Sequence, residues 1–395
     1  MTAPSPHAQH DPLAPTAHRM GPPPFLLGLV MAVVALGFLG PVLESTDWNP
    51  TILAAFGVEA PASLEYAEGL LGEVHPRAGL GHDGKFFFAQ AIDPWLSDRA
   101  TLEAVIDLPI YRAQRMFYPM LAGVFGLAPP GVVVWMLVLV NVAAFGFGTW
   151  VTALVARGMG ASSMWGLAFP VNLGVWSELL VSGAGVVALA ASLAAVAALQ
   201  RGSLVGGMAA LSLSALSREV MLLCAFGIAV WMWRKNAKRA AVYLLTTPVA
   251  VTIGWALYVR SRLGWTAGTD QVSVIGWPFQ GLAGAIDSWL GSPIDLAVGL
   301  VVLVLLVVFT VRSLTRDRLV GWMALGFVPL AFVLTELVWT DFFDITRAVA
   351  PVITAFVLVS FAGDRGSDEI TANLARGTDG SVPSYRLTRR PWRGR

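Results

Sequence analysis

Residues 24–42 read PFLLGLVMAVVALGFLGPV, an apolar run without a charged side chain. A run of this length is sufficient to cross the hydrocarbon core of a bilayer as a helix. Only Arg19 precedes it and no small-residue cleavage site clearly follows, so we expect an uncleaved first membrane span and not a signal peptide. Residues 1–22 are rich in Pro, Ala and His and lack periodicity, which predicts a disordered N-terminus.

The composition of the whole chain agrees with this first span. Hydrophobic residues make up 56% of the 395 residues and charged residues only 13%, against about 25% charged in an ordinary soluble domain. The mean hydropathy is +0.68. We therefore predict an all-α polytopic membrane protein with about ten transmembrane helices, a number that includes two short spans within residues 202–233. Further full-length runs lie at roughly 131–156, 163–180, 184–200, 240–259, 290–311, 319–338 and 345–362.

Two apolar segments do not fit a simple crossing. Residues 116–128 are too short to cross, which predicts a re-entrant or interfacial helix. Residues 202–233 would form one helix of about 48 Å, longer than a bilayer core. One crossing would also separate Arg201 from the basic residues at 234–239. Two short arms that turn at Ser217-Arg218-Glu219 keep both basic groups on one side, with the turn buried at membrane depth.

The distribution of charge predicts the orientation. Segment 43–111 contains many acids but only three bases, so the positive-inside rule assigns it to the outer face and both termini to the cytoplasm. We expect a membrane domain over 23–363, in which 43–128 is a long outer loop with amphipathic helices, and a disordered basic tail over 364–395. Cys224 is the only cysteine, so it cannot form an intramolecular disulfide, and we expect it to pack as a small apolar residue in a span.

Arginines gather at the outer ends of the predicted spans, where the positive-inside rule does not favour them. Charges at membrane depth are costly and by default functional. A guanidinium group binds two phosphate oxygens at once, so convergent arginines beside apolar walls suggest a lipid phosphate. Snorkelling to headgroups and structural ion pairs, such as Arg218 with Glu219 or Arg347 with Asp341 or Asp344, remain alternatives.

The densest mixture of acid, base and aromatic residues lies in the predicted outer loop. Residues 82–88 read HDGKFFF and residues 107–119 read DLPIYRAQRMFYP. The Asp83-Gly84 pair is by itself a turn signal. A carboxylate held against aromatic surface next to a cationic phosphate site would also suit general-base chemistry.

These motifs resemble those of GT-C-type integral-membrane glycosyltransferases. The nearer likeness is to bacterial multi-pass proteins with an Asp-Gly-x-Phe-Phe motif after the first span and a Tyr-Arg-x-x-Arg-x-x-Tyr-Pro motif, here residues 111–119. The pair Arg218-Glu219 and Arg347 correspond to later positions of that group. The resemblance covers residues 24–362 in organisation, but in sequence it covers only these few positions.

The resemblance implies a GT-C-like enzyme in a bacterial plasma (inner) membrane. Such enzymes move a sugar from a polyprenyl-phosphate donor to a glycan, lipid or protein acceptor on the outer face, with inversion. Asp83 would then be the general base. The residues expected to bind donor phosphate or substrate are Arg112, Arg115, Arg218, Glu219, Arg347, Tyr111, Tyr118, Lys85, Arg260 and Arg262. His82, Asp107 and Asp341 would support them.

The cofactor and partner predictions follow from the same likeness. Many members of the wider superfamily place two adjacent carboxylates in this loop, and some bind a divalent metal there. Here Asp83 has His82 beside it and no acidic neighbour, so we expect no cofactor, and a metal held by His82 and Asp83 is the less favoured reading. Membrane lipids are expected partners, and nucleic acid is not. The competing functions are a multi-pass transporter or flippase for a lipid-linked or anionic substrate, and a non-catalytic envelope-assembly protein.

Overall fold

The computed structural model describes residues 21–265 and 274–362, and within these ranges the chain is helical, with three isolated β-bridges and no strand. Four helices are long and apolar enough to cross a membrane, and the number rises to five if a pair bent by 63° counts as one span. The predictions for residues 1–20 and for the tail at 364–395 lie outside the described residues. The four are α1 (Pro24–Glu44), α8 (Pro130–Gly158), α13 (Lys238–Leu263) and α15 (Pro293–Arg316), and the bent pair is α19 (Phe342–Ala348) with α20 (Ala350–Phe361).

These helices confirm an all-α membrane architecture, but ten complete crossings are not shown. Two of the predicted spans are divided into separate helices, and a third, 345–362, is bent between α19 and α20. Segment 163–180 divides into η3 (Ser163–Ala168) and α9 (Leu173–Leu180). Asn172 is the N-cap of α9, since its side chain accepts a hydrogen bond from the Gly174 N–H, and a new helix therefore begins there. Segment 319–338 divides into α16 (Leu319–Leu325), α17 (Phe327–Val333) and α18 (Glu336–Trp339).

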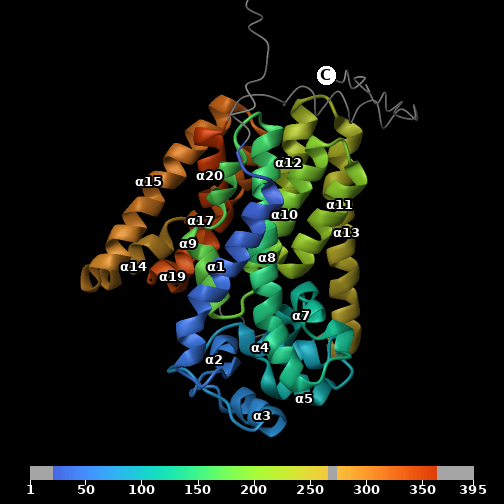
Figure 1. Ribbon diagram of the computed structural model, residues 1–395, viewed down its shortest axis with the longest axis vertical. Helices are drawn as coiled ribbons and strands as arrows, with labels where there is room; N and C mark the ends of the chain where they lie inside the picture. Colours follow the sequence, from blue (N-terminus) through green and yellow to red (C-terminus); the bar gives the residue numbers. More distant parts are fainter. Residues whose placement is uncertain (1–20, 266–273, 363–395) are drawn as a thin grey trace, which may run out of the picture.

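The predicted hairpin over 202–233 is confirmed. Helix α11 (Leu204–Ser217) ends where Arg218 adopts an extended conformation, and η4 (Glu219–Met221) leads into α12 (Leu222–Arg234). The start of α11 and the end of α12 lie at the same end of the bundle. Gln200, which ends α10 (Gly185–Gln200), hydrogen-bonds to the last turns of α8, and Lys235 after α12 pairs with Asp317 after α15. The turn between α11 (Leu204–Ser217) and α12 (Leu222–Arg234) therefore lies away from this end, on the side of the cap (Figure 1).

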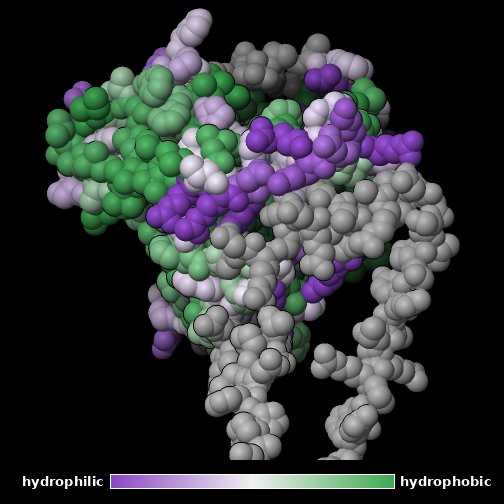
Figure 2. Space-filling model, turned by 90° about the horizontal axis from the view of Figure 1, so that it is seen from above, coloured by the Kyte–Doolittle hydropathy of each residue, from purple (hydrophilic) through white to green (hydrophobic). Residues whose placement is uncertain are grey.

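We call this end of the bundle the basic end. The carbonyl of Pro22, before α1, accepts hydrogen bonds from Arg157 of α8 and Ser163 of η3, and Trp165 of η3 stacks on Phe361 of α20 at a centroid distance of 5.6 Å. A polar band crosses this end, beside a broad apolar flank (Figure 2). The basic residues at these helix ends and their connections are Arg157, Arg201, Arg234, Lys235, Lys238, Arg239, Arg312, Arg316 and Arg318.

The flanks of the long helices are apolar and uncovered. On α15 the side chains of Val301, Val304 and Val307 are exposed to 64%, 63% and 61%. Helices α1 and α13 carry similar rows of exposed Leu, Val and Ile residues. Apolar surface of this extent is stable against lipid and unfavourable against water, so it supports a membrane setting for the bundle.

The opposite end of the bundle is closed by a helical cap, formed by residues 45–129 (Figure 1). This is the segment predicted as a long loop with helices. Within it, residues 116–128 form only short helices, as expected for a segment that does not cross. The cap elements are α2 (Thr51–Ala54), α3 (Pro61–Leu71), α4 (Gly84–Ile92), α5 (Arg99–Val105), α6 (Pro109–Arg112), α7 (Phe117–Ala122) and η2 (Val124–Gly126).

A close approach of backbones fixes the start of α4. A Cβ added to Gly84 would lie 2.5 Å from the Val181 carbonyl oxygen and 2.6 Å from that of Ala54. Neither oxygen belongs to a flexible side chain, so only glycine fits. The Asp83-Gly84 pair therefore begins a helix that docks tightly on the bundle, and this docking fixes the backbone of Asp83.

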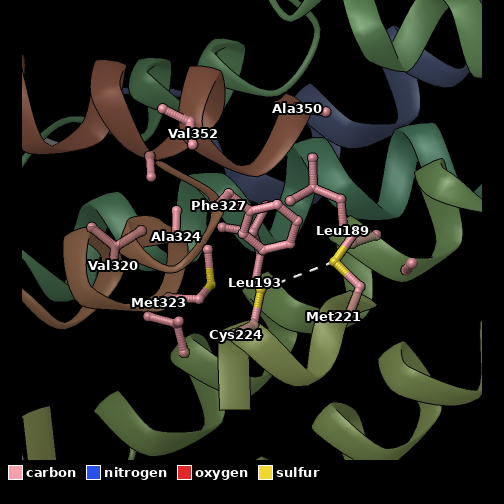
Figure 3. Close-up of a cluster of buried hydrophobic side chains, with 14 of the residues drawn as sticks. Leu189, Leu193, Met221, Cys224, Val320, Met323, Ala324, Phe327, Ala350 and Val352 are labelled. Atoms are coloured by element: carbon pink, nitrogen blue, oxygen red, sulfur yellow. Dashed lines mark hydrogen bonds between the residues drawn. The ribbon is translucent and has the colours of Figure 1, made fainter. Parts of the chain in front are cut away.

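The core between the hairpin and the C-terminal helices is apolar. Cys224 is fully buried there, with its sulfur 4.0 Å from that of Met221 and beside Leu193 and Phe327 (Figure 3). This confirms the expected packing role of the cysteine. Tight packing here holds the α11–α12 turn, and with it Arg218 and Glu219, at a fixed depth.

Candidate functional site

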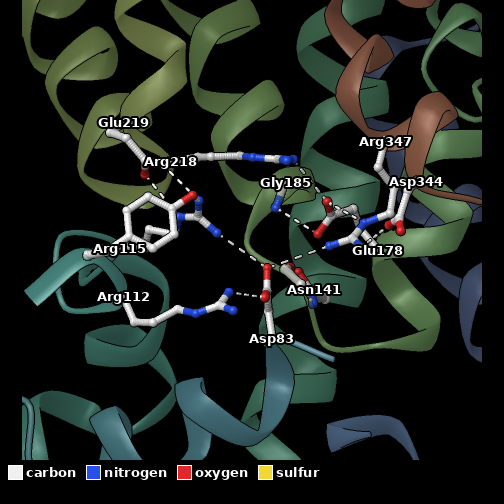
Figure 4. A network of polar contacts seen from close by, with 12 residues as sticks. Asp83, Arg112, Arg115, Asn141, Glu178, Gly185, Arg218, Glu219, Asp344 and Arg347 are labelled. Atoms are coloured by element: carbon white, nitrogen blue, oxygen red, sulfur yellow. Dashed lines mark hydrogen bonds and ion pairs between the residues drawn. The ribbon is translucent and has the colours of Figure 1, made fainter. Parts of the chain in front are cut away.

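Asp83 lies at the centre of a cluster of charged side chains between the cap and the bundle (Figure 4). Its Oδ1 accepts a short hydrogen bond from Arg112 Nη1, where α6 ends. Its Oδ2 lies 3.3 Å from Arg115 Nη1 and 3.7 Å from Arg347 Nη2. Three guanidinium groups, from α6, from the turn before α7 and from α19, thus surround one carboxylate.

Arg115 joins the cap to the hairpin. Its Nε and Nη2 donate to Glu219 Oε2 and Oε1, both at 2.9 Å, in a bidentate pair. Its Nη2 also donates to the Tyr111 hydroxyl, and its guanidinium lies 4.6 Å from the centroid of the Tyr111 ring. Glu219 begins η4, directly after Arg218 at the end of α11, and this turn places its carboxylate within reach of the cap.

Glu178, near the end of α9, accepts hydrogen bonds from Arg347 and Arg218. Its Oε1 accepts from Arg347 Nε at 3.0 Å and from Arg218 Nη1 at 3.1 Å, and its Oε2 accepts from the Gly185 N–H at 3.0 Å. Its side chain is only 3% exposed. Gly183 packs so closely on this carboxylate that it leaves no room for a Cβ. Arg347 additionally donates to Asp344 Oδ1 at 3.0 Å.

The charges of the cluster balance, but its side chains differ in exposure. The cluster contains five cationic and five anionic groups when the rim residues Asp107 and Asp344 and the neighbouring Lys85 are included. Arg347, Arg115 and Glu178 are almost fully buried, whereas the side chain of Asp83 is 23% exposed and that of Glu219 25%. The centre of the cluster and Glu219 are therefore reachable from outside, while Arg347, Arg115 and Glu178 are not.

The surroundings of Asp83 determine its protonation state. Burial raises the pKa of this carboxyl, but the guanidinium groups of Arg112, Arg115 and Arg347 outweigh burial and hold the pKa well below its usual range. Burial and Arg347 also lower the pKa of His82, so at neutral pH its imidazole is neutral. In the free protein Asp83 is a carboxylate, stabilised and correspondingly weak as a base.

Three further residues of the predicted site lie beside the cluster. Asp107 accepts from Arg112 Nε at 2.9 Å. Lys85 is buried, donates to the Leu80 carbonyl and lies 4.8 Å from the centroid of the Phe86 ring, so its ammonium does not reach Asp83 by a direct bond. The His82 ring faces Phe343 at a centroid distance of 5.4 Å.

Four residues of the predicted site lie elsewhere. The buried Tyr118 hydroxyl donates to the Leu137 carbonyl at 2.7 Å and accepts from Asn141, which is a packing role in the cap. Arg260 lies over the Trp265 ring, and Arg262 donates to the Leu96 carbonyl, both at the end of α13. Asp341 caps α19 by accepting the Phe343 N–H at 2.7 Å. The structure does not bring these four into the cluster.

No pattern in the sequence marks Glu178 as a site residue. A single acid near the end of an apolar segment has the pattern of an ordinary interfacial residue, and its partners Arg218 and Arg347 are distant in the chain. Asp344, rather than Asp341, is the acid that pairs with Arg347, three residues along α19. The spacing of the two residues on one helix could have favoured Asp344.

Among the described residues, no group of three or more His, Cys, Asp or Glu side chains is placed to hold a metal ion. The chain matches none of the protein-family models, curated proteins or solved structures with which it was compared.

Replacement of Glu178 tests its anchoring role. Glu178→Ala leaves Arg347 and Arg218 without their shared buried carboxylate, so we expect a loss of about 3–5 kcal/mol in the free energy of unfolding. The measurement is the unfolding transition of the purified protein in detergent micelles. Asp344→Asn is the matched control, because it removes a carboxylate from the same Arg347 at a more exposed position, and it should cost within about 1 kcal/mol. Equal effects of the two substitutions would contradict the anchoring role.

Proposed function

We propose that the protein is a membrane glycosyltransferase that moves a sugar from a polyprenyl-phosphate donor to an envelope acceptor on the outer face of a bacterial plasma membrane. The observation that carries the proposal is the cluster itself, in which one partly exposed carboxylate lies within 3.7 Å of three guanidinium groups, next to lipid-exposed apolar helices. Acid-base chemistry and phosphate binding require these two kinds of group together.

The roles of the residues follow from their positions. Asp83 would remove the proton from the acceptor hydroxyl, which attacks the anomeric carbon on the side opposite the leaving lipid phosphate and inverts its configuration. Arg112, Arg115 and Arg347 would stabilise the negative charge that develops on the leaving phosphate. Arg218 would act with them from its place on Glu178. No metal is required in this scheme, since the guanidinium groups supply the positive charge.

The orientation rests on the distribution of basic residues. They gather at the basic end of the bundle, and the positive-inside rule favours that end on the cytoplasmic side. The cap and the cluster would then face outward. The apolar helices of intermediate length, α10, α11, α12 and α16–α17, would complete a bundle approaching the predicted ten spans by entering the membrane without each crossing it in full.

A transporter of an anionic or lipid-linked substrate is the second candidate, favoured by one observation. Helices α11 and α12 are half-length and meet at a polar break, as the discontinuous helices of transporters do. At this break, however, Glu219 pairs with Arg115 of the cap and Arg218 with Glu178 of α9, and among the described residues neither pairs with a group at the basic end. A transporter would not need a carboxylate placed among the phosphate-binding arginines.

Mass spectrometry of envelope glycans and lipid-linked sugars tests the proposed activity. Deletion of the gene should remove one sugar from an envelope glycan and cause its polyprenyl-phosphate sugar to accumulate. Complementation with Asp83→Asn should leave both changes in place if Asp83 is the base. Complementation with Glu103→Gln, which neutralises an acid of the cap that pairs with Arg99 outside the cluster, should restore the glycan.

The same experiment separates the competing functions. Restoration of the glycan by Asp83→Asn, with the protein inserted at a normal level, would overturn the transferase mechanism and favour a scaffold. Failure of the deletion to change any envelope glycan or lipid-linked sugar would overturn the function altogether.

The dependence of the rate on pH provides an independent check. Because the arginines hold the pKa of Asp83 well below its usual range in the free protein, kcat/KM should show no acid limb from this group between pH 8 and about pH 4. The measurement is kcat/KM against pH with the donor and acceptor that the glycan analysis identifies. An acid limb near pH 6 would indicate a different base.

A further inference from the structure

The position that Asp83 occupies has the features of a binding site for a phosphate group. Guanidinium groups approach the carboxylate from three elements, Arg112 and Arg115 from the cap and Arg347 from α19 (Figure 4). A carboxylate and a phosphate both present paired anionic oxygens to such forks. The inference below rests on the proposed function and concerns how its donor binds.

Two of these arginines are held in place by partners other than Asp83. Arg115 is fixed by its bidentate pair with Glu219, in which both distances are 2.9 Å. Arg347 is fixed by Glu178 and Asp344, both at 3.0 Å. Removal of the Asp83 carboxylate would therefore leave these two guanidinium groups paired and pointing at the vacated position.

Asp83 itself is held less firmly by the same two arginines. Its contacts with Arg115 and Arg347 are 3.3 and 3.7 Å, longer than the 2.7–2.9 Å or so that is usual for such charge-assisted bonds. Only the bond from Arg112 is short, and Arg112 has Asp107 as a second carboxylate. Asp83 is also the N-cap residue of α4, beside the helix N-terminus, where the helix dipole stabilises a negative charge that has left its arginines.

We propose that Asp83 is an internal stand-in for the donor phosphate: the phosphate displaces the Asp83 carboxylate from Arg112, Arg115 and Arg347, and this displacement frees Asp83 to act as the base. Glu178 and Glu219 remain on their arginines throughout. The free protein is thus held in an inactive pairing, and the base becomes effective only when a donor phosphate is present. This ordering protects the acid-base group until a leaving group is in place.

If Asp83 competes with the donor phosphate, removal of its carboxylate should strengthen the binding of a lipid phosphate. Farnesyl phosphate is the probe, with farnesol as its uncharged counterpart and inorganic phosphate as the free anion, each titrated against the full-length protein in nanodiscs. Asp83→Asn should bind farnesyl phosphate about tenfold more tightly than the unsubstituted protein, since an anion that competes for the same charges is gone. Arg347→Ala should lose most of the binding.

Glu103→Gln is the matched control for the change in charge. It removes the same unit charge from α5 of the cap, from a partly exposed side chain that pairs with Arg99 and with none of the three arginines around Asp83. Its effect on farnesyl phosphate affinity should be less than about twofold, because exposed charges are screened. An equal gain in farnesyl phosphate affinity in both variants would show that the effect comes from the change in net charge alone, and would overturn the displacement.

A second measurement uses the protein without substitution. A carbodiimide modifies carboxyl groups in their protonated form, so displacement from the arginines should raise the modification of Asp83, read by peptide mass spectrometry. We expect farnesyl phosphate, but not farnesol, to raise it, and binding of inorganic phosphate with the same effect would identify a free anion as sufficient. Unchanged or lower modification in the presence of bound farnesyl phosphate would overturn the proposal.

The outcomes distinguish this inference from the function on which it rests. Binding to the unsubstituted protein with equal or weaker binding to Asp83→Asn would overturn the displacement and leave the transferase proposal standing. Absence of binding to both proteins would count against both, since a donor phosphate site would then be lacking.

Discussion

The structure depends on the requirement that a guanidinium group taken out of water must be paired. Arg347 and Arg115 are less than a tenth exposed, and an unpaired charge at such positions would cost several kcal/mol. Glu178 and Glu219 meet this requirement, and they do so only because α9 ends and the α11–α12 turn begins at the same depth. The pairing therefore connects the cap, the hairpin and the C-terminal bent helix at one level of the bundle.

The same requirement explains a feature that the shorter helices share. Helices α9 to α12 and the α19–α20 bend bring chain breaks, which carry polar groups, to the level at which the cap docks. Their opposite ends collect the basic residues. Irregular backbone at membrane depth is tolerated where protein buries it, and here the cap helps to provide that cover. The site is thus built where helices stop, while the uninterrupted helices α1, α8, α13 and α15 supply the frame.

The sequence predicted the frame well and the breaks unevenly. Long apolar runs correspond to α1, α8, α13 and α15, and the excess length of 202–233 correctly indicated a turn at Arg218. Length and apolarity could not show that 163–180 and 319–338 are interrupted, because the interruptions depend on a cap at Asn172 and on tertiary contacts of Leu334. Motif likeness grouped Asp83, Arg112, Arg115 and Arg347 as they are found, but it also included Tyr118, whose hydroxyl is used in packing. Glu178 carries no local pattern, so only the fold reveals it.

The central claim is that the arginines around Asp83 bind the phosphate of a lipid-linked donor. The most direct test is a cryo-electron microscopy structure of the protein in nanodiscs with farnesyl phosphate. The account predicts phosphate density within hydrogen-bonding distance of Arg112, Arg115 and Arg347, with the Asp83 side chain moved away and Glu178 and Glu219 unmoved. Phosphate density at any other place, with the Asp83 ion pairs intact, would contradict it.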